Sequence, residues 1–224
     1  MALTPCSDLS AAEWIIAGDR PWQQVVCFGP AGFPAYARLR FLPDPAYPGQ
    51  SENDVHRDGD APSDTVRLRA ALETLTRHTR TPEDCYFCLW DGWTSTIESD
   101  PGTPTPDRHP GIARPGRQSP PASGVPVPGE PKVVLPHRAY LLFHGAVSDI
   151  PDPGAGWMWP GQPGSHTADP AFVWPADHAW CLARDVDPHW AGIGASIPAI
   201  NHLLADSRLD VVPADPRQDQ PRYR

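Results

Sequence analysis

Proline content sets the tightest limit on how this chain can fold. The 224 residues include 31 prolines, and ten of these lie between Pro101 and Pro131. A proline has a fixed φ and no backbone N–H, so segments rich in it cannot form long helices or inner strands. We therefore expect a packed domain interrupted by loops at about 43–62, 94–131 and 148–170. The 94–131 segment is most simply a spacer, and the alternative is a polyproline ligand for a partner domain.

Outside these loops, apolar periodicity and capping residues predict about three helices. The first covers 11–17, where Ser10 begins a capping box. The second follows Ser63 and carries leucines at i, i+4 and i+7, which form one apolar face. The third follows Ser196, which is a favourable N-cap residue.

Short apolar runs between the helices predict strands. The sequence contains no repeated strand–helix–strand pattern and no early glycine fingerprint, which argues against a doubly wound sheet. We expect a single α+β domain over 1–216, with a largely antiparallel sheet of five or six strands, followed by a flexible tail over 217–224. The predicted strands are a hairpin within 24–42 and single strands near 85–90, 138–145, 180–186 and 208–215.

The charge balance narrows the class of partner. Asp and Glu number 27 against 18 Lys and Arg, a formal net charge of −9 at pH 7. An acidic chain without a basic run disfavours nucleic-acid binding and suits a basic protein partner. The sequence shows no apolar stretch long enough to cross a membrane and no signal peptide, and its five cysteines are an odd number. These features together predict a cytoplasmic protein that does not bind membranes.

The segment WPADHAWCLARDVDPHWAGIGAS, residues 174–196, has the densest mixture of aromatic and charged residues. In an extended conformation Trp180 and Leu182 share one face, while Cys181 and Ala183 share the other. Because both faces are apolar, this segment should be a central strand covered on each side. A functional site is then expected where the strand ends.

Three side chains follow this strand at alternating positions. Asp185, Asp187 and His189 would point the same way if the extended conformation continued, and could then hold Mg²⁺, Mn²⁺ or Zn²⁺. The simpler interpretation is a turn, since Asp187-Pro188 is a common turn starter.

The glycines that follow these residues predict a possible anion-binding site next to the metal. Gly192, Gly194 and Ser196 precede the last helix, where backbone N–H groups could bind an anion. Together with a metal, they would suit hydrolysis of a phosphate ester. The alternative is a tight turn that leads into a packed helix.

The cysteines favour packing over chemistry. Cys85 and Cys88 form a CxxC pair, but they lie within a predicted strand, where residues i and i+3 face opposite sides. A zinc site would need a second pair of ligands at matching spacing, which the sequence does not offer. We therefore interpret both, and Cys181, as buried structural cysteines.

Tryptophans suggest another kind of surface. Trp157 and Trp159 lie in a predicted loop, and Trp190 follows the acidic segment. Exposed tryptophans often mark contact surfaces for a partner. The alternative is that they cover the sheet of their own domain.

Three blocks of the chain resemble shared blocks of uncharacterised proteins from high-GC actinobacteria: PAFVWPADHAWCLARDVDPHWAGIGAS, CYFCLWDGW and LPHRAYLLFHG. The resemblance covers most of the chain apart from the proline-rich insertions. It implies a single cytoplasmic domain and carries over no catalytic residue.

Two functional hypotheses remain. The first is a non-enzymatic interaction module without a cofactor, of an immunity or antitoxin kind, that binds a basic protein. The second is a metal-dependent hydrolase that uses Asp185, Asp187 and His189 on a phosphate ester.

Overall fold

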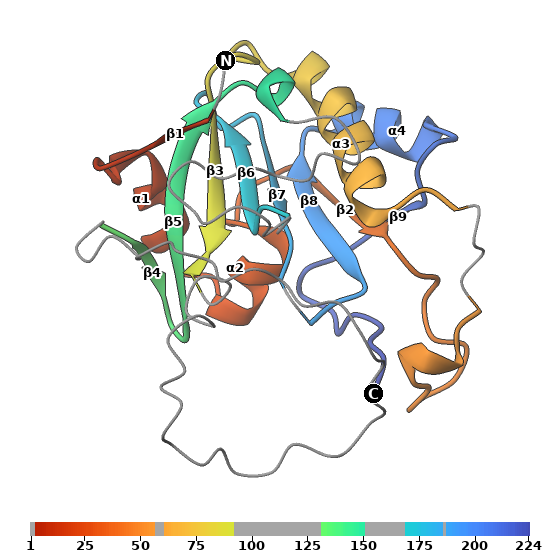
Figure 1. Cartoon of the computed structure of the whole chain (residues 1–224). Coiled ribbons are helices and arrows are strands. Elements are labelled where there is room, and N and C mark those ends of the chain that lie inside the picture. Colours follow the sequence, from red (N-terminus) through yellow and green to blue (C-terminus); the bar gives the residue numbers. More distant parts are fainter. Residues whose placement is uncertain (1–2, 57–60, 92–130, 151–168, 186) are drawn as a thin grey trace, which may run out of the picture.

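In the computed structural model, helices lie on both faces of one antiparallel sheet (Figure 1). Most of the predicted 94–131 loop lies outside the described residues, as do Trp157 and Trp159. The structure describes residues 3–56, 61–91, 131–150, 169–185 and 187–224.

All nine strands of the described residues belong to one antiparallel sheet, against five or six predicted. Their order is β1-β5-β3-β6-β7-β8-β2-β9, and β4 also pairs with β5. The strands are β1 (Thr4–Pro5), β2 (Ala35–Arg40), β3 (Cys85–Trp90), β4 (Val133–Leu135), β5 (Arg138–Gly145), β6 (Phe172–Pro175), β7 (Trp180–Ala183), β8 (Trp190–Ala195) and β9 (Val211–Pro213).

The α-helices are α1 (Glu13–Ile16), α2 (Trp22–Phe28), α3 (Asp64–Leu75) and α4 (Ile197–Ala205). Ser63 and Ser196 cap α3 and α4 as predicted: their hydroxyls accept hydrogen bonds from the amides of Val66 and Ala199. Short 3-10 helices are η1 (Ser10–Ala12), η2 (Glu52–Asp54), η3 (Thr76–His78) and η6 (Val147–Asp149). No helix in the described part of the chain is long and apolar enough to span a bilayer.

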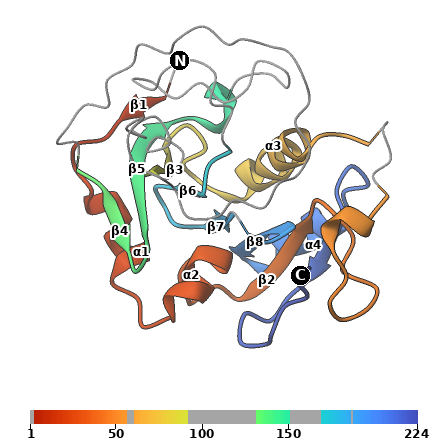
Figure 2. The ribbon, with the colours of Figure 1, turned by 60° about the horizontal axis from the view of Figure 1, so that its bottom comes forward.

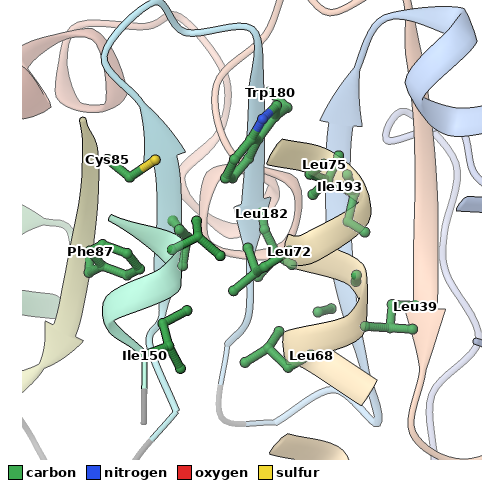
Figure 3. Close-up of a cluster of buried hydrophobic side chains, with 14 of the residues drawn as sticks. Leu39, Leu68, Leu72, Leu75, Cys85, Phe87, Ile150, Trp180, Leu182 and Ile193 are labelled. Carbon is green, nitrogen blue, oxygen red and sulfur yellow. The ribbon is translucent and has the colours of Figure 1, made fainter. Parts of the chain in front are cut away.

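The central strand of the sheet is β7, as the sequence predicts. It pairs with β6 on one side and β8 on the other, and all four of its residues are buried. On one face, Trp180 and Leu182 pack with Leu68, Leu72 and Leu75 of α3 in a cluster that α4 also joins (Figure 3). The strand therefore contributes to two separate cores, one on each side of the sheet.

The opposite face is covered by α1 and α2. Here Ile15 of α1 and Val25 and Val26 of α2 belong to a second buried cluster with Trp174 and Cys181. Cys85 lies in the first cluster and Cys88 in the second, so the two cysteines of the CxxC pair do face opposite sides.

The first half of the predicted 24–42 hairpin is wrong, because residues Trp22–Phe28 form helix α2. Pro21 lies directly before the helix, where its missing N–H is not needed. Gly29 ends the helix at φ 72°, and a Cβ there would lie only 2.7 Å from Sγ of Cys181. The second half is strand β2, as predicted, but it pairs with β8 and β9.

The predicted flexible tail instead packs against the sheet domain. Tyr223 Oη donates a hydrogen bond of 2.6 Å to the carbonyl of Pro43, and the amide of Arg224 donates one of 2.9 Å to Gln50. Trp190 Nε1 donates to the carbonyl of Pro221 at 3.4 Å. These contacts bring the C-terminal segment beside α2, at the end of the sheet where β7 finishes (Figure 2).

Candidate functional site

A cavity of about 490 Å³ opens beside the end of β7. One wall is α2, another is the segment that follows β7 together with Arg138, and a third is the C-terminal segment 216–223. Figure 2 shows α2 and the C-terminal segment close together on this side of the sheet. We name this cavity the α2 cleft. It lies where the sequence predicts a site, although two of its three walls were not anticipated.

An ion pair forms the charged wall of the α2 cleft. Arg138 Nε lies 3.2 Å from Oδ1 of Asp185, and both side chains are largely buried. Burial alone would lower the pKa of Arg138, but the hydrogen bond to Asp185 outweighs it and holds the pKa above its ordinary value. The guanidinium also lies over the ring of Trp90, 5.3 Å from its centroid. Arg138 is thus fixed from two sides.

The carboxylate of Asp187 stands at the mouth of this wall. Its Oδ2 is 3.6 Å from Nη2 of Arg138, and 82% of its side chain is exposed. The structure therefore brings Asp185 and Asp187 together on one arginine. The carboxylate of Asp187 remains open to solvent and to a ligand.

The third predicted metal ligand, His189, points elsewhere. Its side chain is buried, and Nε2 lies 3.2 Å from Oδ1 of Asp44. Its ring also packs edge-on against Tyr223, with 4.7 Å between centroids. Burial lowers the pKa of His189 in spite of the hydrogen bond to Asp44. Because the chain turns between β7 and β8, the extended run that would have aligned the three side chains does not exist.

The expected metal cluster is therefore not assembled. Asp185 and Asp187 both pair with Arg138, whereas His189 pairs with Asp44. Throughout the described ranges, no group of three His, Cys, Asp or Glu side chains is placed to hold a metal ion. The donor set does not fit a divalent cation at this position.

The two glycines predicted to bind an anion lie inside strand β8. Both glycines pair with residues of β2 and of β7, so their backbone is part of the sheet. A Cβ on Gly192 would lie 2.0 Å from the carbonyl oxygen of Cys27, and one on Gly194 would lie 2.3 Å from Cδ2 of Phe33. Their role is to let α2 and the loop after it approach the sheet, rather than to form a turn. Ser196 caps α4, as predicted for a helix start.

Cys27 lines the α2 cleft but is a poor nucleophile. Burial, assisted by the nearby charge of Asp185, raises the pKa of this thiol to about 12. None of the described residues that line the cleft is a histidine that could act as its base. Burial similarly raises the pKa of Cys85 to about 12, which agrees with a structural role.

Aromatic side chains form the apolar part of the α2 cleft. Trp190 is only 3% exposed, and its ring lies 5.0 Å from that of Phe28, so it forms the floor of the cleft. Trp22, at the start of α2, also lines the cleft. Sequence reasoning missed Trp22 because it did not recognise α2, and no motif marks this tryptophan.

Comparison with known proteins adds no assignment: no family model, curated protein or solved structure matches this chain. The α2 cleft combines aromatic walls and one fixed ion pair with exposed charges of both signs, namely Asp187, Asp219, Arg217 and Arg222.

Proposed function

We propose that this chain is a non-enzymatic interaction module that binds a segment of a partner protein in the α2 cleft. The observation that carries the proposal is the composition of the cleft walls, which are aromatic and charged but offer no activated nucleophile. The cleft thus has the apolar and charged surfaces that recognition needs. Among the described residues that line it, there is no nucleophile paired with a base, as acyl transfer needs.

The size of the α2 cleft suits a few side chains. Its volume of about 490 Å³ falls within the range of roughly 300–1,000 Å³ usual for ligand sites. Trp22 and Tyr223 are half-buried and can contact an inserted side chain, while the buried rings of Phe28 and Trp190 form the floor beneath it. A partner loop or extended segment fits this space better than the flat face of a domain.

Charge favours a basic partner. The chain carries a net charge of −9, and Asp187 at the mouth of the cleft is mostly exposed. The overall negative charge attracts a basic partner and accelerates its association at low salt, while the cleft lining itself carries both aspartates and arginines. A role of the immunity or antitoxin kind, in the cytoplasm, is the specific form of this proposal.

The alternative, a metal-dependent phosphate-ester hydrolase, has less support. Its three expected ligands fall into two separate groups, and its two glycines belong to a strand.

Selection of peptides from a displayed random library tests the proposed function. The immobilised protein should enrich a consensus with a basic residue next to an aromatic or aliphatic one. A synthetic consensus peptide should then bind the wild-type protein in a fluorescence titration. We expect Asp187→Arg to weaken that binding at least tenfold.

Glu83→Arg is the matched control, since Glu83 is an exposed acid that precedes β3 at the other end of the sheet. It makes the same change of charge and should bind like the wild type. If no consensus is enriched, or if both variants bind equally well, the proposed function is wrong.

A further inference from the structure

Two histidines from different helical elements meet on the α3–α4 side of the molecule. His78 ends η3, which continues α3, and His202 lies in the last turn of α4. His78 Nε2 and His202 Nδ1 are 2.8 Å apart, and the ring planes are inclined by 71°. The α2 cleft lies on the opposite face of the sheet, so this pair is independent of the proposed function.

Packing of the two helices fixes the separation of the imidazoles. Leu75 and Leu203, one on each helix and near each histidine in sequence, are fully buried in the same cluster. One turn away, Thr74 Oγ1 donates a hydrogen bond of 3.1 Å to Oδ2 of Asp206. The two rings therefore meet because their helices are held together, which makes the arrangement preorganised.

We propose that His78 and His202 form a two-ligand site for a divalent transition metal such as Zn²⁺. A zinc ion binds imidazole nitrogen at about 2.0–2.1 Å, so two nitrogens on one tetrahedral ion are roughly 3.3 Å apart. The observed 2.8 Å is close to this separation, and His202 is exposed, so a small rotation of its side chain opens the space. Water, or a donor group from another molecule, completes the coordination.

Metal binding must replace the hydrogen bond between the two rings. One of the facing nitrogens carries the proton of this bond and the other accepts it. When zinc binds, that proton moves to the other nitrogen of its ring, so that both facing lone pairs become available to the ion. The positive charge of Arg77 opposes a bound cation, so we expect a weak site rather than a structural one.

Zinc titration followed by NMR of the histidine side chains tests this site in the full chain at pH 7. Added ZnCl₂ should shift the ring signals of His78 and His202 together and saturably. Calorimetry should show that this binding weakens at least tenfold in His78→Asn and in His202→Asn. His56→Asn changes an exposed histidine elsewhere and should leave the binding unchanged.

The far-UV circular dichroism of each variant shows whether it is folded. His202 is exposed, so His202→Gln is a second variant that removes the Nδ1 ligand with little risk to folding. The proposal is overturned if millimolar zinc leaves both ring signals in place, or if a folded His202 variant binds zinc as tightly as the wild type.

Discussion

The face of the sheet under α3 and α4 is filled by apolar side chains, whereas the face under α1 and α2 combines a smaller apolar cluster with glycines, charged side chains and a cleft. Strand β2 has one apolar side and one side that carries polar groups. Its Ala37 and Leu39 are fully buried in the cluster under α3 and α4. Its Tyr36 and Arg38 face the other way, against Phe28 and Trp190. Alternation along a single strand thus separates a core from a polar network.

The two faces also achieve close packing in different ways. Under α3, leucine side chains fill the space, as Figure 3 shows. Under α2, Gly192 and Gly194 remove side chains so that the helix and its following loop can touch the strand backbone. The first face has the larger apolar cluster, and the second combines a smaller one with paired charges and an open cleft.

The largest expected effect is on the α3 face. Leu72→Ala removes a fully buried side chain and should lower the free energy of unfolding by about 3 kcal/mol, because it leaves a cavity. Leu204→Ala, on the exposed side of α4, is the control and should cost less than about 1 kcal/mol. Urea denaturation measures both, and equal losses would contradict the assignment of the main core to this face.

The second largest effect on stability is expected where α2 lies close to the backbone of the sheet. Gly192→Ala places a methyl group 2.0 Å from the carbonyl of Cys27, so α2 must move, at an expected cost of about 2 kcal/mol. Gly18→Ala meets only one atom, at 4.0 Å, and should be nearly neutral. If thermal and urea unfolding show the two variants to be equally stable, the glycines do not have the packing role given to them here.

The charged network of the α2 face should show itself in the pH dependence of stability. Asp44 receives hydrogen bonds from Arg38 and His189, which outweigh the effect of burial and lower its pKa from 3.8 to about 2. A folded-state pKa below the unfolded one means that Asp44 stabilises the fold above pH 4 and loses this effect as the pH falls toward 2. We expect a contribution of about 1–2 kcal/mol at neutral pH.

Asp44→Asn isolates this contribution from those of other carboxylates. The variant should be less stable than the wild type at pH 6, and the difference should shrink between pH 4 and pH 2. Urea midpoints across this range measure it. A constant difference would show that Asp44 does not titrate as described.

The smallest expected effect concerns the C-terminal segment. Tyr223→Phe removes the hydrogen bond to Pro43 and should cost about 1 kcal/mol or less. Tyr47→Phe changes an exposed tyrosine and serves as the control. Hydrogen exchange at the amide of Arg224 should become faster only in the Tyr223 variant, and unchanged exchange would indicate that this bond does not hold the segment.

Much of the α3 face could be predicted from the sequence. The leucines of α3 have helical spacing, its cap is a serine, and β7 is apolar on both sides. Such patterns are local, and they depend only on whether a residue faces a core. The opposite orientations of Cys85 and Cys88 followed from strand geometry in the same way.

The α2 face could not be predicted as well, because its structure depends on distant residues. Val25, Val26 and Phe28 have a strand-like composition, yet they form a helix that packs against the sheet at Gly192. Likewise, Asp185 is paired with an arginine 47 positions earlier in the chain, and only the strand order brings them together. Strand β7 ends at Ala183, short of the predicted 180–186, and the partners of the side chains that follow it were not predicted.

Tryptophan indole N–H signals can show whether a partner segment binds in the α2 cleft. Titration with the selected consensus peptide should shift the signals of Trp22 and Trp190, which line the cleft. The signal of Trp180, buried on the α3 face, should stay in place. If Trp180 shifts and the two cleft tryptophans do not, binding takes place on the other face and the account is contradicted.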